Sequence, residues 1–310
     1  MAHNRAVSRP FVRRPFAELP ETPSPPHAWG ITSALTVEVE SQHFGRMNTH
    51  VHTLGAGPPL LLVHGLMTTS YSWRYVIAQL AEHYRVIVPD LPGAGRSDKP
   101  PVHYHPEALA TWIGELQRTL GIVGCDAVGN SLGGYLCMLR ALEDPGAFRR
   151  LVNIHSPAHP DFRYSALGTL LGTPGAQSLL DWLIRRDPER WVWRNVHYYD
   201  ERRKSREETR EYAAPLSHPD GRRAFTSYLR DAMSASGFRR LRQRLSTQTF
   251  PVPLCLLYSR MDPLVPPRNG PYLQSLIPAA QLRWLYDTSH FAHVDTPEPV
   301  IAAVRAFFDA

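Results

Sequence analysis

The chain has 310 residues, of which 43% are apolar, 20% charged and 10% aromatic. This length and composition are sufficient for a large hydrophobic core, so they exclude a disordered protein and a small disulfide scaffold. With 34 Lys and Arg against 28 Asp and Glu, the net charge is +6. Such mild basicity identifies no partner by itself.

Residues 1–28 are rich in arginine and proline. The apolar stretch that a secretion signal needs does not follow the arginines, and the prolines oppose an amphipathic helix. We therefore expect this segment to be a flexible arm.

From about residue 30, strand-like and helix-like stretches alternate, which is typical of a mostly parallel sheet with helices on both faces. Eight strands are predicted, and the first two form a hairpin; they cover residues 35–40, 47–53, 60–63, 86–88, 125–128, 151–154, 253–258 and 282–285. Helices are predicted over residues 71–83, 106–120, 132–139 and 299–308.

Over residues 156–248 this alternation stops, and the chain becomes polar, helix-like and rich in arginine. We interpret this segment as a helical cap inserted after the sixth strand, with the α/β core formed by residues 29–155 and 249–310. Acidic residues are mixed with the arginines throughout, so a nucleic-acid-binding surface is not expected.

The three cysteines, Cys125, Cys137 and Cys255, stand in apolar runs without C-x-x-C spacing. They are predicted to be buried and reduced, which favours the cytoplasm. No apolar run approaches the roughly 20 residues of a membrane helix. We therefore expect neither a membrane span nor a membrane partner.

The main chemical signal is a G-x-S-x-G motif, Gly129-Asn130-Ser131-Leu132-Gly133, placed directly between a predicted strand and a predicted helix. Glycines at these positions permit a sharp turn that exposes the serine at the carboxyl edge of the sheet. The helix that follows directs its unsatisfied N–H groups and positive dipole end toward developing negative charge.

With this motif in place, the sequence resembles the α/β-hydrolase superfamily from about residue 30 to the end. His64-Gly65 matches the H-G element of that family, and residues 90–98 match the loop after its fourth strand. Asp262 follows the seventh predicted strand and His290 follows the last, where the family keeps its acid and its histidine. The chain order of serine, acid and histidine is the one that this fold imposes.

The resemblance implies a catalytic triad of Ser131, Asp262 and His290. His290 would take the proton of the serine hydroxyl, and Asp262 would fix the tautomer of His290. The backbone N–H groups of Leu66 and Leu132 would form the oxyanion hole.

Several acidic and histidine residues compete for these roles. Asp287 and Asp295 are alternatives to Asp262 because both lie close to His290 in the sequence, and His293 is an alternative to His290.

A metal cluster of His155, His159 and Asp161 is disfavoured, because prolines at 157 and 160 oppose the helix that this spacing requires. We expect no metal and no cofactor.

A serine at the nucleophile position argues against epoxide hydrolases and haloalkane dehalogenases, which the resemblance implies would carry aspartate there. We expect an ester hydrolase that acts on a small to medium, largely apolar small-molecule substrate through an acyl-enzyme. Met67, Asn130 and Phe291 are the residues expected to contact it.

Two other functions stay open. The elbow is similar to that of C–C bond hydrolases of ring-fission products, but their H-G-x-G-P-G-A stretch is His64–Ser70 here and their tryptophan after the histidine is Phe291. The third possibility is a non-catalytic member that only binds a ligand. The sequence does not indicate an oligomeric state.

Overall fold

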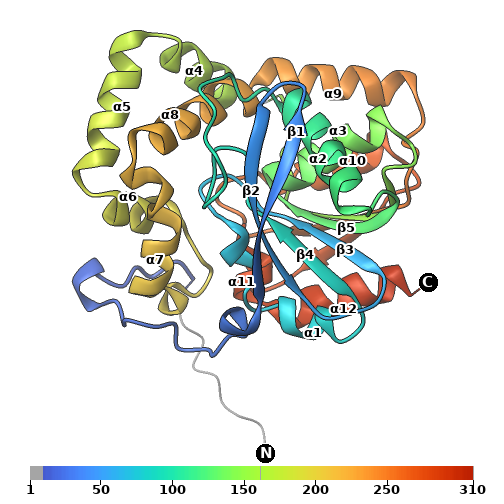
Figure 1. The fold of residues 1–310 in the computed structure, drawn as a ribbon, viewed down its shortest axis with the longest axis horizontal. Coiled ribbons are helices and arrows are strands. Elements are labelled where there is room, and N and C mark those ends of the chain that lie inside the picture. The colour runs from blue at the N-terminus through green and yellow to red at the C-terminus, as the bar shows by residue number, and fades with distance from the viewer. Residues whose placement is uncertain (1–9, 161, 310) are drawn as a thin grey trace, which may run out of the picture.

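The structure, a computed structural model, describes residues 10–160 and 162–309. Its centre is a single eight-stranded sheet in the order β1-β2-β4-β3-β5-β6-β7-β8 (Figure 1). The strands are β1 (Ser33–Ser41), β2 (Gly45–Leu54), β3 (Pro59–Val63), β4 (Arg85–Pro89), β5 (Cys125–Asn130), β6 (Phe148–Ile154), β7 (Leu254–Ser259) and β8 (Gln281–Leu285). Only the pairings of β2 with β1 and β4 are antiparallel. All eight predicted strands are confirmed.

Twelve α-helices accompany the sheet in the described ranges. They are α1 (Ile77–Ala81), α2 (Pro106–Leu120), α3 (Leu132–Glu143), α4 (Phe162–Leu171), α5 (Pro174–Arg186), α6 (Pro188–Asn195), α7 (Arg206–Ala213), α8 (Pro219–Ser227), α9 (Ala235–Thr247), α10 (Asn269–Leu276), α11 (Ala292–Asp295) and α12 (Pro297–Phe308). The helix predicted over residues 71–83 is divided into a 3₁₀ turn, Ser70–Trp73, and the short α1. Among these helices, none has the length and apolar character needed to cross a bilayer.

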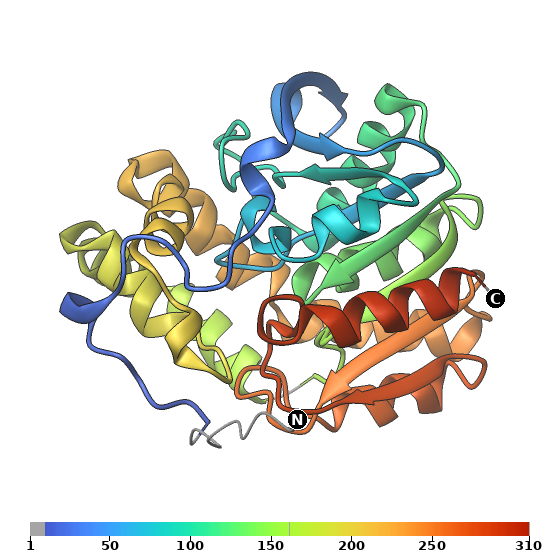
Figure 2. The same cartoon turned by 90° about the horizontal axis from the view of Figure 1, so that it is seen from below.

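Both faces of the sheet are covered, which explains why its central strands are continuously apolar. In β3, Leu61 and Val63 belong to the core under α2 and α3, whereas Leu60 and Leu62 belong to the core under α1 and α12. Figure 2 shows the two helix layers on opposite sides of the sheet. The three cysteines are buried without disulfides.

Helices α4–α8 form a separate group beside the sheet (Figure 1). We call residues 156–234 the cap segment. Helix α9, which the sequence assigns to the cap, instead packs on the core: Phe238 and Leu241 are buried there, and the Phe238 ring lies 5.0 Å from that of Tyr135. The chain therefore rejoins the core at α9, one helix before the predicted boundary at residue 248.

The arm predicted as flexible contacts the cap segment from residue 10 onward. The backbone N–H of Phe11 donates to the carbonyl of Tyr199 at 3.0 Å. The Phe16 ring lies 3.7 Å from the guanidinium carbon of Arg206, as a cation–π contact. The arm is thus attached through aromatic residues, and its proline and arginine content does not predict this attachment.

A buried ion pair joins the cap segment to the core. Arg74, which follows the 3₁₀ turn, is fully buried and donates to the carboxylate of Glu208 on α7. Its guanidinium also donates to the hydroxyl of Tyr212 at 3.2 Å and lies 4.5 Å from the ring centres of Tyr71 and Tyr75. Loss of the carboxylate would leave this cation buried without a counter-charge.

Replacing Glu208 by alanine should therefore lower the free energy of unfolding by about 3–5 kcal/mol. Denaturant melts of the wild type and the variant measure this change. The double variant Arg74→Met/Glu208→Leu removes both charges at similar volume and should recover most of the loss. A cost below about 1 kcal/mol for the single variant would show that the pair behaves like an exposed one.

Candidate active site

Ser131 lies at the sharp turn between β5 and α3. Its φ of 54° and ψ of −119° place a non-glycine residue in a rarely occupied region of backbone conformation. Its N–H donates to the carbonyl of Ile154 on the neighbouring strand at 2.7 Å, and its carbonyl accepts from the hydroxyl of Ser156 at 2.7 Å. The strained turn is therefore held by the end of β6.

The glycines of the motif are required by close packing. A Cβ at Gly133 would lie 2.2 Å from the carbonyl oxygen of Val63, and one at Gly129 would lie 2.5 Å from the Cα of Gly134. Neither approach is possible for a side chain, so helix α3 can pass this close to the sheet only with glycine at both positions.

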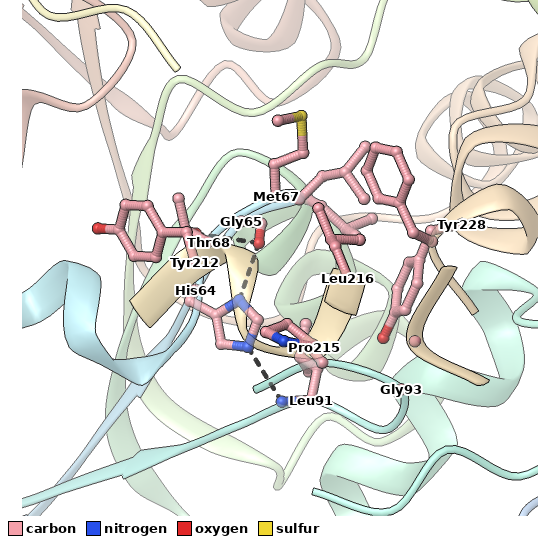
Figure 3. A pocket seen from close by; sticks show the side chains of 15 residues that line it. His64, Gly65, Met67, Thr68, Leu91, Gly93, Tyr212, Pro215, Leu216 and Tyr228 are labelled. Atoms are coloured by element: carbon pink, nitrogen blue, oxygen red, sulfur yellow. Dashed lines mark hydrogen bonds between the residues drawn. The ribbon is translucent and has the colours of Figure 1, made fainter. Parts of the chain in front are cut away.

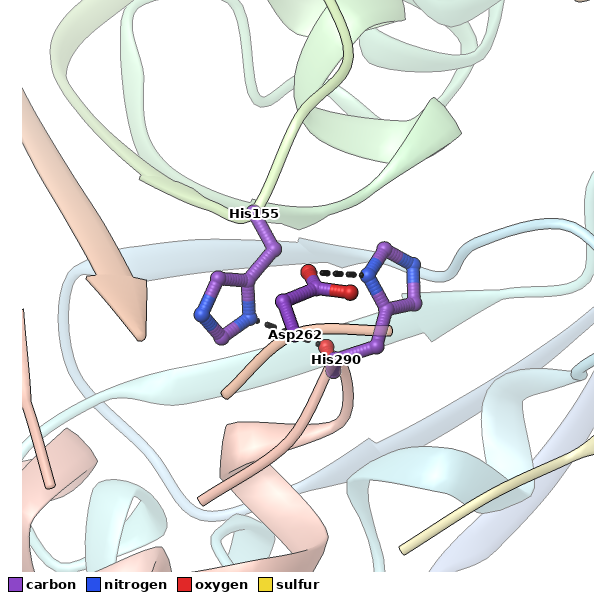
Figure 4. A group of neighbouring side chains, drawn as sticks. All are labelled: His155, Asp262 and His290. Carbon is purple, nitrogen blue, oxygen red and sulfur yellow. Dashed lines mark hydrogen bonds and ion pairs between the residues drawn. The ribbon is translucent and has the colours of Figure 1, made fainter. Parts of the chain in front are cut away.

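Asp262 and His290, which are 28 residues apart, are brought together at the ends of β7 and β8. The Nδ1 of His290 donates to Oδ2 of Asp262 at 2.7 Å, and both side chains are buried. Burial opposes ionisation of Asp262, but the charge and hydrogen bond of His290 outweigh it and hold the pKa of Asp262 below its usual range. With Nδ1 directed at the carboxylate, Nε2 is the ring nitrogen of His290 that faces away from Asp262 (Figure 4).

The competing acids and histidine have other partners. Asp287 is exposed and accepts from the hydroxyl of Tyr199 at 3.0 Å. Asp295 accepts from the backbone N–H groups of Ser289 and Tyr199. His293 is stacked on a tryptophan ring at 4.3 Å, and burial lowers its pKa well below the usual value. The geometry thus favours the Asp262–His290 pair over these alternatives.

The loop after β3 carries the first proposed oxyanion donor. His64 accepts from the backbone N–H of Leu91 at Nε2 and donates from Nδ1 to the carbonyl of Gly65. Burial lowers its pKa, so it is a neutral ring that fixes the loop. Met67 has a φ of 61°, which turns the chain sharply after Leu66.

The second proposed donor, Leu132, is the first residue of α3. The N–H groups of the first helical turn have no partner within the helix. In the described part of the chain, neither the N–H of Leu66 nor that of Leu132 donates to another protein group.

Comparison with known proteins identifies the family of the chain. The sequence profile of the alpha/beta hydrolase fold family matches residues 58–297. The chain belongs to the alpha/beta hydrolase family. The hydrolase is 38% identical over 112 residues to 2-hydroxy-6-oxo-2,4-heptadienoate hydrolase of Pseudomonas putida, a match that spans 35% of this chain and only 41% of that protein.

Two further proteins match over most of their length. Haloalkane dehalogenase 2 of Mycobacterium bovis is 26% identical, over 86% of this chain and 93% of the dehalogenase. The structure of a thermophilic esterase from Thermogutta terrifontis superposes with a TM-score of 0.70 at 23% identity, over 89% of this chain and 98% of the esterase. The esterase structure shows that the two chains share the fold.

A narrow cavity of the hydrolase lies between the loops at the carboxyl ends of the strands and the cap segment (Figure 3). Leu66 and Leu132 line it from the core, and Leu216 and Phe225 line it from the cap. The space that the centre of a water molecule can occupy is about 40 Å³, which corresponds to about three water molecules. None of the described residues that line it is Asp, Glu, Lys or Arg.

Of the three residues expected to contact substrate, one lines the cavity and two do not. Met67 lines the cavity. Asn130 and Phe291 do not, because both are buried in the packing around the site. Asn130 donates to the backbone carbonyl of His290 at 3.1 Å, and the Phe291 ring packs edge-on against Tyr198. Their side chains support the site rather than line it.

From the sequence, His155 is considered only as part of a disfavoured metal cluster and is given no role at the active site. His155, at the end of β6, lies with Asp262 and His290 so closely that one ligand-type atom of each falls within 4.8 Å of the others. Its Nδ1 donates to the carbonyl of His290 (Figure 4). His155 Nδ1, Asp262 Oδ2 and His290 Nδ1 each take part in a hydrogen bond within this group.

The other members of the disfavoured metal cluster do not join this group. His159 packs against Tyr272 with a ring distance of 4.9 Å. Asp161 lies outside the described residues.

Asp295 connects the loop of His290 to the cap segment and is fully buried. Burial raises the pKa of its carboxyl to about 6, although the hydroxyl and N–H of Ser289 oppose the shift. An acid whose pKa is higher in the folded than in the unfolded state destabilises the fold once it ionises. We expect its contribution to stability to fall by about 2 kcal/mol as the pH rises from about 4 to 6.

The variant Asp295→Asn carries no ionisable group, so its free energy of unfolding relative to the wild type should rise over this pH range. Denaturant melts between pH 4 and pH 7 measure the difference. Asp287→Asn, at an exposed position of the same loop, is the matched control. A constant difference between the wild type and Asp295→Asn at every pH would contradict the expectation.

Proposed function

We propose that this hydrolase cleaves carboxylic esters of small to medium, uncharged and largely apolar substrates by a serine mechanism. The observation that carries the proposal is a cavity lined mainly by apolar side chains, without Asp, Glu, Lys or Arg among its described residues, beside the proposed oxyanion donors Leu66 and Leu132. Such a surface binds an uncharged acyl group without desolvating any charge.

The proposed reaction gives each member of the proposed triad one step. Nε2 of His290 removes the proton of the Ser131 hydroxyl as Oγ forms a bond to the ester carbonyl carbon. The carbonyl oxygen becomes an oxyanion, and the N–H groups of Leu66 and Leu132 stabilise it. Asp262 stabilises the imidazolium through the 2.7 Å hydrogen bond.

The tetrahedral intermediate then loses its alcohol, which takes the proton from His290 and leaves an acyl-serine. Water repeats the sequence: His290 removes a proton from it, the hydroxide oxygen bonds to the acyl carbon, and Ser131 leaves with the proton. The products are a carboxylic acid and the free enzyme.

The sequence similarity to 2-hydroxy-6-oxo-2,4-heptadienoate hydrolase favours C–C cleavage as the second candidate. The name of that relative describes a carboxylate substrate. A carboxylate bound in the cavity of this protein would have no cationic side chain of a described lining residue to pair with. Burying an unpaired carboxylate is strongly unfavourable, so the cavity supports the ester over the dienoate.

The experiment compares nitrophenyl esters from acetate to decanoate with 2-hydroxy-6-oxo-2,4-heptadienoate as substrates of the wild type. We expect ester turnover with the best kcat/KM at a short or medium acyl chain, because the cavity is narrow. Cleavage of the dienoate with no turnover of any ester would replace the proposal by C–C hydrolysis. A folded protein that cleaves neither and is not labelled at Ser131 by a fluorophosphonate would be a ligand-binding member.

A further inference from the structure

His155 stands directly beside the proposed catalytic pair, and the mechanism above gives it no role. It is fully buried, and its φ of 51° places it in the left-handed region that residues other than glycine rarely adopt. A strained backbone of this kind persists only where the surrounding structure holds it, and it is concentrated at functional sites.

The hydrogen bond of His155 defines its tautomer. Its Nδ1 donates to the backbone carbonyl of His290 at 3.0 Å, so Nδ1 carries the proton and Nε2 has a lone pair. Among the described residues, Nε2 has no hydrogen-bond partner. The ring lies nearly parallel to that of His290, at 25° and 5.9 Å between centres, and edge-on to Tyr258 (Figure 4).

The ring of His155 is also neutral. Burial lowers its pKa to about 4, although the nearby Asp262 acts in the opposite direction. A neutral neighbour matters here, because a second positive charge beside His290 would oppose the imidazolium that forms during catalysis.

The carbonyl of His290 accepts a second hydrogen bond, from the amide of Asn130 at 3.1 Å. Asn130 is the residue before Ser131, and Ile154, the residue before His155, accepts the N–H of Ser131. One carbonyl thus links the histidine loop both to the nucleophile turn and to the end of β6.

We propose that His155 is a positioning residue, which holds the backbone of His290 so that its imidazole stays aligned with Ser131. The inference rests on the serine mechanism proposed above. It goes beyond that mechanism, because it assigns a role in catalysis to a residue that need not touch substrate. A displacement of the base by about 1 Å can cost about 100-fold in rate.

Two variants of His155 separate its hydrogen bond from its volume. His155→Leu fills part of the volume of the imidazole with an apolar side chain but has no hydrogen-bond donor. His155→Asn can place an N–H near the position of Nδ1 and tolerates a positive φ. We expect His155→Leu to lower kcat for ester hydrolysis about 10- to 100-fold with little change in KM, and His155→Asn to retain most of the activity.

His52→Leu is the matched control for stability. His52 is also buried, and its Nδ1 is 2.7 Å from the hydroxyl of Thr32, but it lies on β2, which β4, β3 and β5 separate from β6 in the sheet. Melting temperatures of both leucine variants show how far each substitution weakens the fold. His52→Leu should keep the kcat of the wild type even if it melts at a similar temperature to His155→Leu.

The rate of Ser131 labelling by a fluorophosphonate provides a second readout, which does not depend on the substrate. Slower labelling of His155→Leu than of the wild type and His52→Leu supports the inference. Equal rates in all three overturn it, as does a His155→Asn variant that is as slow as His155→Leu. A folded wild type that is neither labelled nor active on esters refutes the serine mechanism itself, and the inference falls with it.

Discussion

Replacing Ser131 by alanine should lower kcat for nitrophenyl ester hydrolysis by about 10⁶-fold. The hydroxyl is the atom that bonds to the acyl carbon, so no other group of the site can substitute for it. Alanine retains the Cβ at the positive φ, so the backbone strain of the turn is the same in both proteins. We therefore expect the melting temperature to change little.

The control for this variant is Ser72→Ala. Ser72 is equally buried, in the 3₁₀ turn of the core, and within the described residues its hydroxyl has no hydrogen-bond partner. Ester hydrolysis by each variant is measured with and without a fluorophosphonate, and the rate that remains with the fluorophosphonate is the background. If Ser131→Ala retained more than about a tenth of the wild-type rate while Ser72→Ala was fully active, the nucleophile would lie elsewhere.

The parts of this site that the sequence predicts are those with a local signature. A serine between glycines after an apolar strand predicts a sharp turn, and the structure shows why: at Gly133 any Cβ would collide with the carbonyl of Val63. The acid and the histidine follow the ends of two parallel strands, and such ends meet at one edge of a sheet. The resemblance to the α/β hydrolases adds which residues at these ends are the acid and the histidine, and so predicts the pairing of Asp262 with His290.

The parts that the sequence does not predict depend on contacts between distant segments. The hydrogen bond from His155 to the carbonyl of His290 joins residues 135 positions apart and has no signature in composition. Phe16 lies in the segment predicted to be a flexible arm, yet its ring packs against the guanidinium of Arg206. Helix α9 is as polar as the cap helices before it, and the burial of its few apolar residues, Phe238 and Leu241 among them, assigns it to the core.

Replacing Asp262 by asparagine should lower kcat by about 10⁴-fold and leave the fold intact. The carboxylate accepts the Nδ1–H of His290, and its pKa is held below the usual range by that contact despite burial, so it is charged at neutral pH. An amide can turn its NH₂ toward Nδ1, which would move the ring proton to Nε2 and block the lone pair that must accept the proton of Ser131.

This prediction also decides between the acids near the histidine. Asp287→Asn removes a carboxylate from the same loop. Asp287 is exposed and accepts a hydrogen bond from the hydroxyl of Tyr199, so its loss should keep kcat within a few-fold of the wild type. Steady-state kinetics with the same ester give both values. If Asp287→Asn lost the activity and Asp262→Asn did not, the acid of the triad would be Asp287, and the 2.7 Å contact of Asp262 would serve only to order the loop.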